Sequence, residues 1–180
     1  AIGSFLLVTG FYMFGIYTAY YTYCGYGAYA GGKCLLPVYK NLEKEEAPEI
    51  TIQADAPVIQ SFTNWCGRLE SVLVFVKSLP DDPAGSLRFS LLDDTQQTLA
   101  SRDFPIKDIG TREYLELPVV TPPGSRDGTY VIRLEAVGLA SPFEEIIVSG
   151  TRSDNYPGQL SVNGIEKNYD LLIRYLCTGP

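Results

Sequence analysis

The pattern of apolar and polar residues along this 180-residue chain changes near residue 49. Residues 1–32 carry no charged side chain, and Ile, Leu, Val, Phe and Tyr dominate residues 2–21. From residue 49 onward, short apolar runs alternate with Gly, Pro, Asn and Asp. About 20 apolar residues suffice for a helix that crosses a hydrocarbon core, whereas short runs between turn residues are typical of strands. The pattern predicts a hydrophobic, Tyr-rich anchoring helix over 1–32, a linker over 33–48 and a β-sandwich over 49–180.

The β-rich part is predicted from alternation with a period of two and from turn residues. Alternation is clearest at Leu87–Leu91 and Tyr130–Glu135, while Val72–Val76 is apolar on both faces and suits a central strand. Asn163-Gly164 is a strong hairpin signal, because a type I′ turn needs positive φ at both central residues. Strands are predicted over Glu49–Ala54, Val58–Thr63, Leu69–Ser78, Ser86–Leu92, Leu99–Phe104, Glu113–Val119, Thr129–Ala136, Glu145–Ser149, Gln159–Val162 and Asp170–Cys177. This series predicts a mainly β fold, an antiparallel jelly-roll sandwich preceded by one transmembrane-type helix.

The N-terminal segment is predicted to anchor the protein and to pack against other subunits. Gly3, Gly10, Gly15 and Ala19 permit close approach between helices in a bilayer. Tyr favours the membrane–water interface, so the Tyr cluster either marks the exit of the helix or forms a packing surface for a neighbour. A cleaved signal peptide competes with both, but it would show a basic region and a small-x-small cleavage site. The predicted anchor and assembly residues are Phe5, Phe11, Tyr12, Phe14, Tyr17, Tyr20 and Tyr21.

Composition narrows the chemistry of the chain. Histidine is absent, which removes the usual general base and every imidazole metal ligand. The net charge of −7 argues against nucleic acid as a partner, because phosphate binding needs a basic surface. No phosphate-binding or nucleophile-elbow motif occurs in the sequence. We therefore expect no catalytic site, no metal and no cofactor.

Four cysteines, Cys24, Cys34, Cys66 and Cys177, allow three complete disulfide pairings. We favour Cys24–Cys34, which closes a Gly- and Tyr-rich turn, and Cys66–Cys177, which ties an early strand end to the last strand. Disulfides imply an oxidising compartment. Lys33 and Lys40 follow the predicted helix and would instead favour a cytoplasmic location for this side. Two charges are a weak signal, so we follow the cysteines and predict a location outside the cytoplasm.

The paired carboxylates are interpreted first as structural. Asp81-Asp82 and Asp93-Asp94 lie in turn sequences, with a loop Ca²⁺ site as the alternative. Glu45-Glu46 and Glu144-Glu145 are predicted to be solvated. Trp65, the one tryptophan, either packs over the disulfide at Cys66 or stacks on a sugar. It is the possible glycan contact of this chain.

Several short stretches are similar to an extracytoplasmic jelly-roll domain of bacterial membrane proteins. They include Gln60-Ser61-Phe62-Thr63, Gly85-Ser86-Leu87, Tyr156-Pro157-Gly158-Gln159, Asn163-Gly164 and Asp170-Leu171. The resemblance covers about residues 57–176 and implies a galactose-binding-like architecture, often fused to proteins that handle polyprenyl-linked sugars. It carries no catalytic residues. The overall plan also resembles type IV pilins, although Phe5 stands where a bacterial pilin has Glu.

These observations predict a non-catalytic subunit of a larger membrane or cell-surface assembly. Its N-terminal helix would contact the lipid bilayer and other membrane or filament subunits. Its β-sandwich would face the periplasm or the exterior. A pilin-like filament subunit and a surface glycan-binding module are the alternatives.

Overall fold

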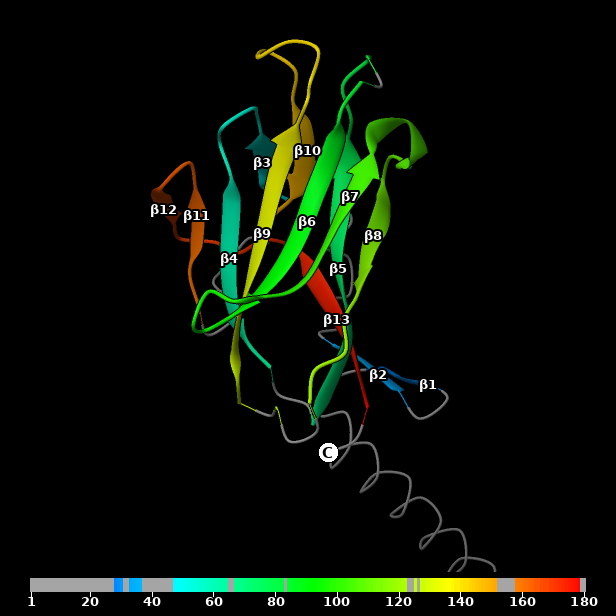
Figure 1. The fold of residues 1–180 in the computed structure, drawn as a ribbon, viewed down its shortest axis with the longest axis vertical. Coiled ribbons are helices and arrows are strands. Elements are labelled where there is room, and N and C mark those ends of the chain that lie inside the picture. The colour runs from blue at the N-terminus through cyan, green and yellow to red at the C-terminus, as the bar shows by residue number, and fades with distance from the viewer. Residues whose placement is uncertain are drawn as a thin grey trace, which may run out of the picture.

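The computed structural model describes residues 28–30, 33–36, 47–64, 67–82, 84–122, 125, 127–151 and 158–178. In this part of the chain, two antiparallel β-sheets pack face to face, one in front of the other in Figure 1. The front sheet has the order β12-β11-β4-β9-β6-β7 and the rear sheet the order β1-β2-β13-β5-β10-β3, with β8 paired to β5. The prediction of an antiparallel two-sheet sandwich is confirmed.

The strands have the following bounds. The front sheet contains β12 (Ile165–Lys167), β11 (Leu160–Val162), β4 (Val58–Thr63), β9 (Thr129–Val137), β6 (Ser86–Asp93) and β7 (Thr98–Pro105). The rear sheet contains β1 (Ala28–Ala30), β2 (Lys33–Leu36), β13 (Ile173–Thr178), β5 (Arg68–Ser78), β10 (Ile146–Ser149), β3 (Glu49–Ile52) and β8 (Glu113–Pro118). A short 3₁₀ helix, η1 (Ile106–Asp108), joins β7 to β8.

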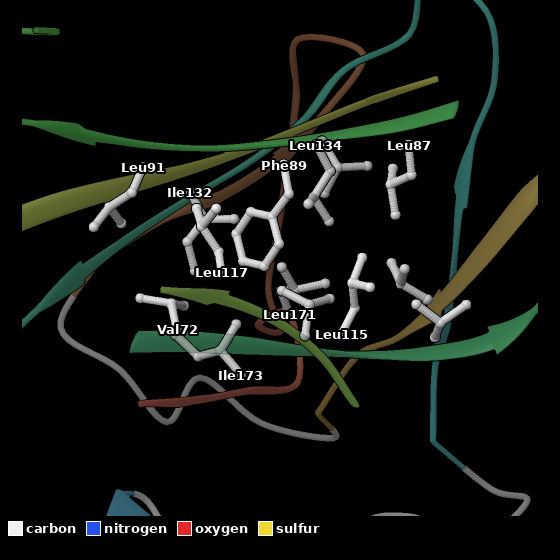
Figure 2. Packing of buried hydrophobic residues seen from close by; sticks show 14 of the residues in the cluster. Val72, Leu87, Phe89, Leu91, Leu115, Leu117, Ile132, Leu134, Leu171 and Ile173 are labelled. Carbon is white, nitrogen blue, oxygen red and sulfur yellow. The ribbon is translucent and has the colours of Figure 1, made fainter. Parts of the chain in front are cut away.

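The core lies between the sheets and is built from alternate positions of the strands. Figure 2 shows Phe89, Ile132 and Leu134 of the front sheet facing Val72 and Ile173 of the rear sheet. These side chains are fully buried. Burial of one such side chain stabilises the fold by about 1.5–3 kcal/mol, so the period-two pattern explains why these strands form.

Strand β5 is central to the rear sheet, as its apolar run predicted. It pairs with β8 along one edge and with β13 and β10 along the other. Val72, Val74 and Val76 face the core with no exposed area. Phe75, between them, lies on the opposite face and makes an edge contact with Tyr114 at 5.1 Å between ring centroids. The apolar side chains on both faces of β5 therefore have packing partners.

The predicted strand positions are largely confirmed, with three additions. Strands β1, β2 and β12 have three or four residues each, too short for a period of two to be recognised. Lys33–Leu36 lies in the segment predicted as a linker, yet it forms β2 and pairs with β13. Backbone hydrogen bonds to the last strand, which no local pattern reveals, place it in the sheet. Likewise Ala28–Ala30, within the segment 1–32, forms β1.

The predicted hairpin at Asn163-Gly164 is confirmed. Both residues have positive φ, 51° and 74°, and they join β11 to β12. A helix was predicted over residues 1–32, and at residues 28–30 this prediction is wrong, because they form strand β1 through backbone hydrogen bonds to β2. The rest of that segment lies outside the described residues. Within the part of the chain that the structure describes, no helix has the length and apolar character needed to cross a membrane.

Candidate functional site

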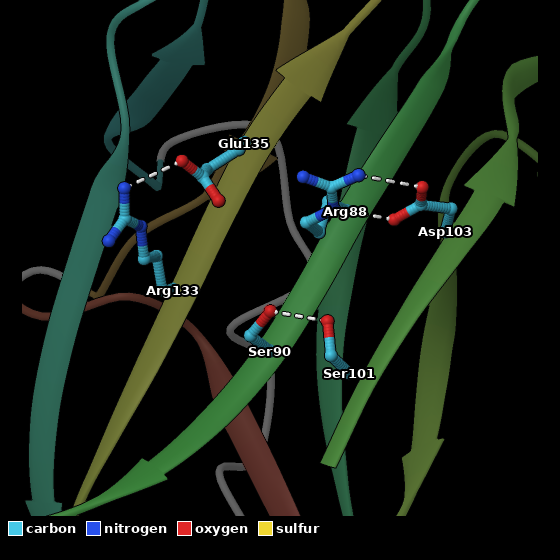
Figure 3. Close-up of polar contacts among 6 residues, drawn as sticks. All are labelled: Arg88, Ser90, Ser101, Asp103, Arg133 and Glu135. Atoms are coloured by element: carbon cyan, nitrogen blue, oxygen red, sulfur yellow. Dashed lines mark hydrogen bonds and ion pairs between the residues drawn. The ribbon is translucent and has the colours of Figure 1, made fainter. Parts of the chain in front are cut away.

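The outer face of the front sheet carries a row of alternating charges, drawn in Figure 3. Strand pairing places Arg88 of β6 between Glu135 of β9 and Asp103 of β7. The Arg88 guanidinium donates through Nε and Nη2 to the two carboxylate oxygens of Asp103, at 2.7 and 2.9 Å. Arg133 donates through Nη2 to Oε1 of Glu135 at 2.7 Å. We call Arg133, Glu135, Arg88 and Asp103 the charged row.

Hydrogen bonds in the charged row shift the ionisation of its members. The hydrogen bond from Arg88 is the main reason that the pKa of Asp103 lies below its ordinary value of 3.8, and the charge of Arg88 adds to it. The same hydrogen bond and the charge of Asp103 raise the pKa of Arg88, to which Glu135 contributes as well. Both side chains are more than 40% exposed, so solvent screens the pair and its contribution to stability is small. Arg88 and Asp103 are therefore both ionised at neutral pH.

A hollow of about 540 Å³ lies beside the charged row. Its wall combines Arg88, Arg133 and Glu135 with the β3–β4 turn, residues 53–57, and the end of β9, residues 136–138. Asp55 holds a positive φ of 62° in this turn, which is closed by a hydrogen bond from the Ala56 N–H to the Gln53 carbonyl at 3.2 Å. The hollow and the charged row form the candidate site of the described residues.

A second polar cluster ties the two sheets together inside the core. The Gln60 amide of β4 donates through Nε2 to the Asp170 carboxylate at 3.0 Å and accepts from the Leu171 N–H at 2.9 Å. Gln60 and Asp170 have 0% and 2% exposure. Both belong to stretches that carry the resemblance to the jelly-roll domain. Their hydrogen bonds attach the segment before β13, a strand of the rear sheet, to β4 of the front sheet.

Another pair from these stretches meets at the edge of β4. The Ser61 hydroxyl accepts from the Gln159 N–H at 2.7 Å, and the Ser61 N–H donates to the Gln159 carbonyl at 3.1 Å. A Cβ atom on the neighbouring Gly158 would lie 2.1 Å from the Ser61 carbonyl oxygen. The chain therefore needs glycine at 158 to approach β4.

The turn interpretation of the paired aspartates is confirmed. Asp93 Oδ1 accepts from the backbone N–H groups of Thr95 and Gln97, each at 2.9 Å, and from the Thr95 hydroxyl at 2.7 Å. These hydrogen bonds, that of the Thr95 hydroxyl first, lower the pKa of Asp93. Asp82 accepts from the Ala84 N–H at 2.9 Å. Both side chains stabilise turns.

Glu144 and Glu145, predicted to be merely solvated, have structural partners. Glu144 accepts from the Ala140 N–H at 3.1 Å and so closes the β9–β10 loop. Glu145 accepts from the Gln53 amide at 2.6 Å and links that loop to the β3–β4 turn. Both hydrogen bonds are exposed to solvent, so the two side chains face water as predicted and in addition hold the loop, as acidic groups beside backbone N–H donors often do. Glu45 and Glu46 lie outside the described residues.

The predicted assembly residues, Phe5 to Tyr21, lie outside the described residues, as do Trp65, Cys24 and Cys66. Cys177 is fully buried and disulfide-bonded. Its partner is outside the described side chains, so the Cys66–Cys177 and Cys24–Cys34 pairings remain predictions. On the backbone, Cys177 of β13 stands opposite Cys34 of β2 on one side and Leu69 of β5 on the other.

Sequence reasoning did not identify the charged row. Its signal was present in part, since Arg88, Arg133 and Glu135 occupy the polar positions of the two clearest alternating strands. Their meeting depends on strand register, which joins Arg88 to residues 15 and 47 positions away and is not readable from the pattern. Among the described residues, no group of three His, Cys, Asp or Glu side chains is placed to hold a metal ion.

Comparisons with known proteins do not add a family to this picture. No protein-family model matches the chain, and no curated protein is significantly similar to it.

Proposed function

We propose that this protein is a non-catalytic accessory subunit, anchored by its N-terminal segment in a larger membrane or cell-surface assembly. The observation that carries the proposal is the pairing of β2 with β13. Strand β2 follows the uncharged segment 1–32 directly in sequence. Through β2, residues 33–36 are hydrogen-bonded to β13 of the sandwich, so a load on the preceding segment would pass to the sheet.

The disulfide at Cys177 supports a location outside the cytoplasm, facing the periplasm or the exterior. Disulfides form and persist in oxidising compartments, and reducing systems remove them from most cytosolic proteins. The contacts of Gln60, Gly158 and Asp170, which belong to stretches that carry the resemblance to an extracytoplasmic jelly-roll domain, help to fix the sandwich and so support that comparison. We propose that the sandwich is such a domain.

The ionisation of Asp93 and Asp103 supports a structural role for these two carboxylates. A general acid or base works best with a pKa near the working pH, and active sites raise carboxylate pKa values to reach it. Asp93 and Asp103 have their pKa lowered. They remain ionised at neutral pH and serve as hydrogen-bond acceptors.

Single substitutions in the N-terminal segment of the full chain test this proposal. We expect Phe11→Ala, Phe14→Ala and Tyr17→Ala to disrupt assembly, because loss of an aromatic anchor from a packed interface costs about 2 kcal/mol or more. Trp65→Ala and Asp93→Ala are the controls and should leave assembly intact. Sedimentation of detergent extracts measures assembly, and circular dichroism checks that the β-sandwich is folded.

The outcome also separates the alternatives. Wild-type material that shears off as fibres would favour the pilin-like filament subunit. Normal assembly in all three N-terminal variants would contradict the anchoring proposal.

A surface glycan-binding module is the second candidate function. The observation that favours it is the polar hollow beside the charged row, which is open to solvent and lined by both donors and acceptors.

A further inference from the structure

The hollow presents hydrogen-bonding groups that the protein itself does not use. Among the described residues, Nη1 of Arg88 has no protein partner, because Nε and Nη2 of this side chain are taken by Asp103. Arg133 uses Nη2 alone and Glu135 uses Oε1 alone in their shared hydrogen bond. The side chains of Arg88, Arg133 and Glu135 are 42%, 44% and 28% exposed. Free donors and free acceptors therefore face the same volume.

Among the side chains that line the hollow, the positive and negative charges are equal in number. Arg88 and Arg133 contribute two positive charges, and Glu135 and Asp55 contribute two negative ones. An anion that approached either arginine would also meet a carboxylate, and a cation would meet a guanidinium. A zwitterion would have to compete with ion pairs that are already formed at 2.7 Å. A neutral ligand can use the free N–H groups and lone pairs without breaking any of them.

Part of the wall of the hollow consists of small residues and is held in place by contacts within the protein. Ala54, Ala56, Ala136 and Gly138 line it with little or no side chain, so the volume stays open. Ala54 bridges to Ala136 on β9, and the Gln53–Glu145 hydrogen bond ties the turn to the neighbouring loop. A wall that is held in place before a ligand arrives lowers the entropic cost of binding.

We propose that this hollow binds an uncharged sugar unit of a glycan. Each hydroxyl of a sugar can donate and accept one hydrogen bond at the same time, which matches a wall with mixed donors and acceptors and no net charge. A volume of about 540 Å³ lies within the usual range for small-molecule sites and admits one or two sugar rings. The inference deepens the second candidate function and does not depend on the anchor.

Nuclear magnetic resonance of the full chain in detergent micelles tests the proposal. The probes are the methyl glycosides of glucose, galactose, mannose and N-acetylglucosamine. We expect at least one of them to give saturable shifts at the backbone amides of residues 54–56 and 136–138, with a millimolar Kd. Among the residues that the structure describes, no aromatic ring lines the hollow to stack on a sugar, and hydrogen bonds that replace water are individually weak.

Matched variants locate the site. Arg133→Gln should weaken binding by about tenfold, which corresponds to 1.4 kcal/mol. Ala56→Trp should abolish binding because it fills the hollow. Arg102→Gln is the control, since Arg102 lies on β7 of the same sheet, stacks on Phe104 and does not line the hollow. It should bind as the wild type does.

Three results would overturn the proposal. One is the absence of saturable shifts with every glycoside at concentrations up to about 100 mM, far above the Kd expected for a real site. Another is tighter binding of glycine or inorganic phosphate than of the glycosides at residues 54–56. The third is equal binding by wild type and Ala56→Trp. This experiment measures binding and not assembly, so failure of the sugar site would not affect the anchoring proposal. Failure of the anchoring proposal would likewise not affect the sugar site.

Discussion

The polar bridge inside the core offers a sharp test of how the two sheets are held together. Gln60→Leu keeps a side chain of similar size in β4 but removes both the donor to Asp170 and the acceptor for the Leu171 N–H. All three residues are buried, with 2% exposure or less. Water therefore cannot replace the lost partners without opening the core.

The magnitude follows from these contacts. An unpaired buried N–H costs about 1–3 kcal/mol, and the lost hydrogen bond to Asp170 costs about 1 kcal/mol more. The leucine side chain recovers about 1 kcal/mol through its additional apolar surface. We expect Gln60→Leu to lower the free energy of unfolding by about 1–3 kcal/mol.

Urea unfolding followed by circular dichroism measures this loss, with all variants in the same detergent. Gln97→Leu is the matched control, because Gln97 is exposed in the turn after β6. A surface substitution of this kind should stay within about 0.5 kcal/mol of wild type. A loss below about 1 kcal/mol in Gln60→Leu, with an unchanged dependence on urea, would refute the importance of the bridge.

Three further predictions concern Gly158, Asp103 and the disulfide partner of Cys177. Gly158→Ala should destabilise the fold by about 2 kcal/mol or more in the same urea assay, since its Cβ would lie 2.1 Å from the Ser61 carbonyl oxygen; wild-type stability would contradict this. Because the pKa of Asp103 is lower in the folded protein than its ordinary value of 3.8, the ionised side chain stabilises the fold at pH values above 3.8. This stabilisation is lost as the pH falls through the pKa of the folded state. Asp103→Asn should therefore lose less stability than wild type between neutral pH and that range, and equal losses would contradict the pairing. Peptide mapping without reduction should recover Cys66 linked to Cys177, whereas a Cys34–Cys177 link or free thiols would show that the predicted pairing is wrong.

Much of the β-sandwich could be predicted from the sequence, because short stretches of residues determine its strands and turns. The alternation in β6 and β9 reports which face is buried, and Asn163-Gly164 reports a turn that few residue pairs form as readily. Strand β2 was missed for the opposite reason. Its four residues show no pattern of their own, and hydrogen bonds to β13, at the far end of the chain, place it in the sheet.

The candidate site was less predictable, since it depends on register. Arg88, Asp103 and Glu135 come from three strands, and a shift of one residue in any of them would send its side chain to the other face. The hollow needs the β3–β4 turn as well, where Asp55 adopts a positive φ. Aspartate tolerates this conformation, but its presence in a sequence does not predict it. The alternating pattern marks Arg88, Arg133 and Glu135 as polar positions, but only the pairing of the strands brings these side chains together.

Deletion of residues 1–23 from the full chain tests the anchoring claim most directly, because it removes the uncharged apolar segment and retains β1 and β2. Cell fractionation, with circular dichroism of the recovered protein, shows where the shortened chain resides and whether its sandwich is folded. The proposal predicts a folded, soluble head that no longer associates with membranes or fibres. A shortened chain that stays in the membrane or polymer fraction as fully as the wild type would contradict it.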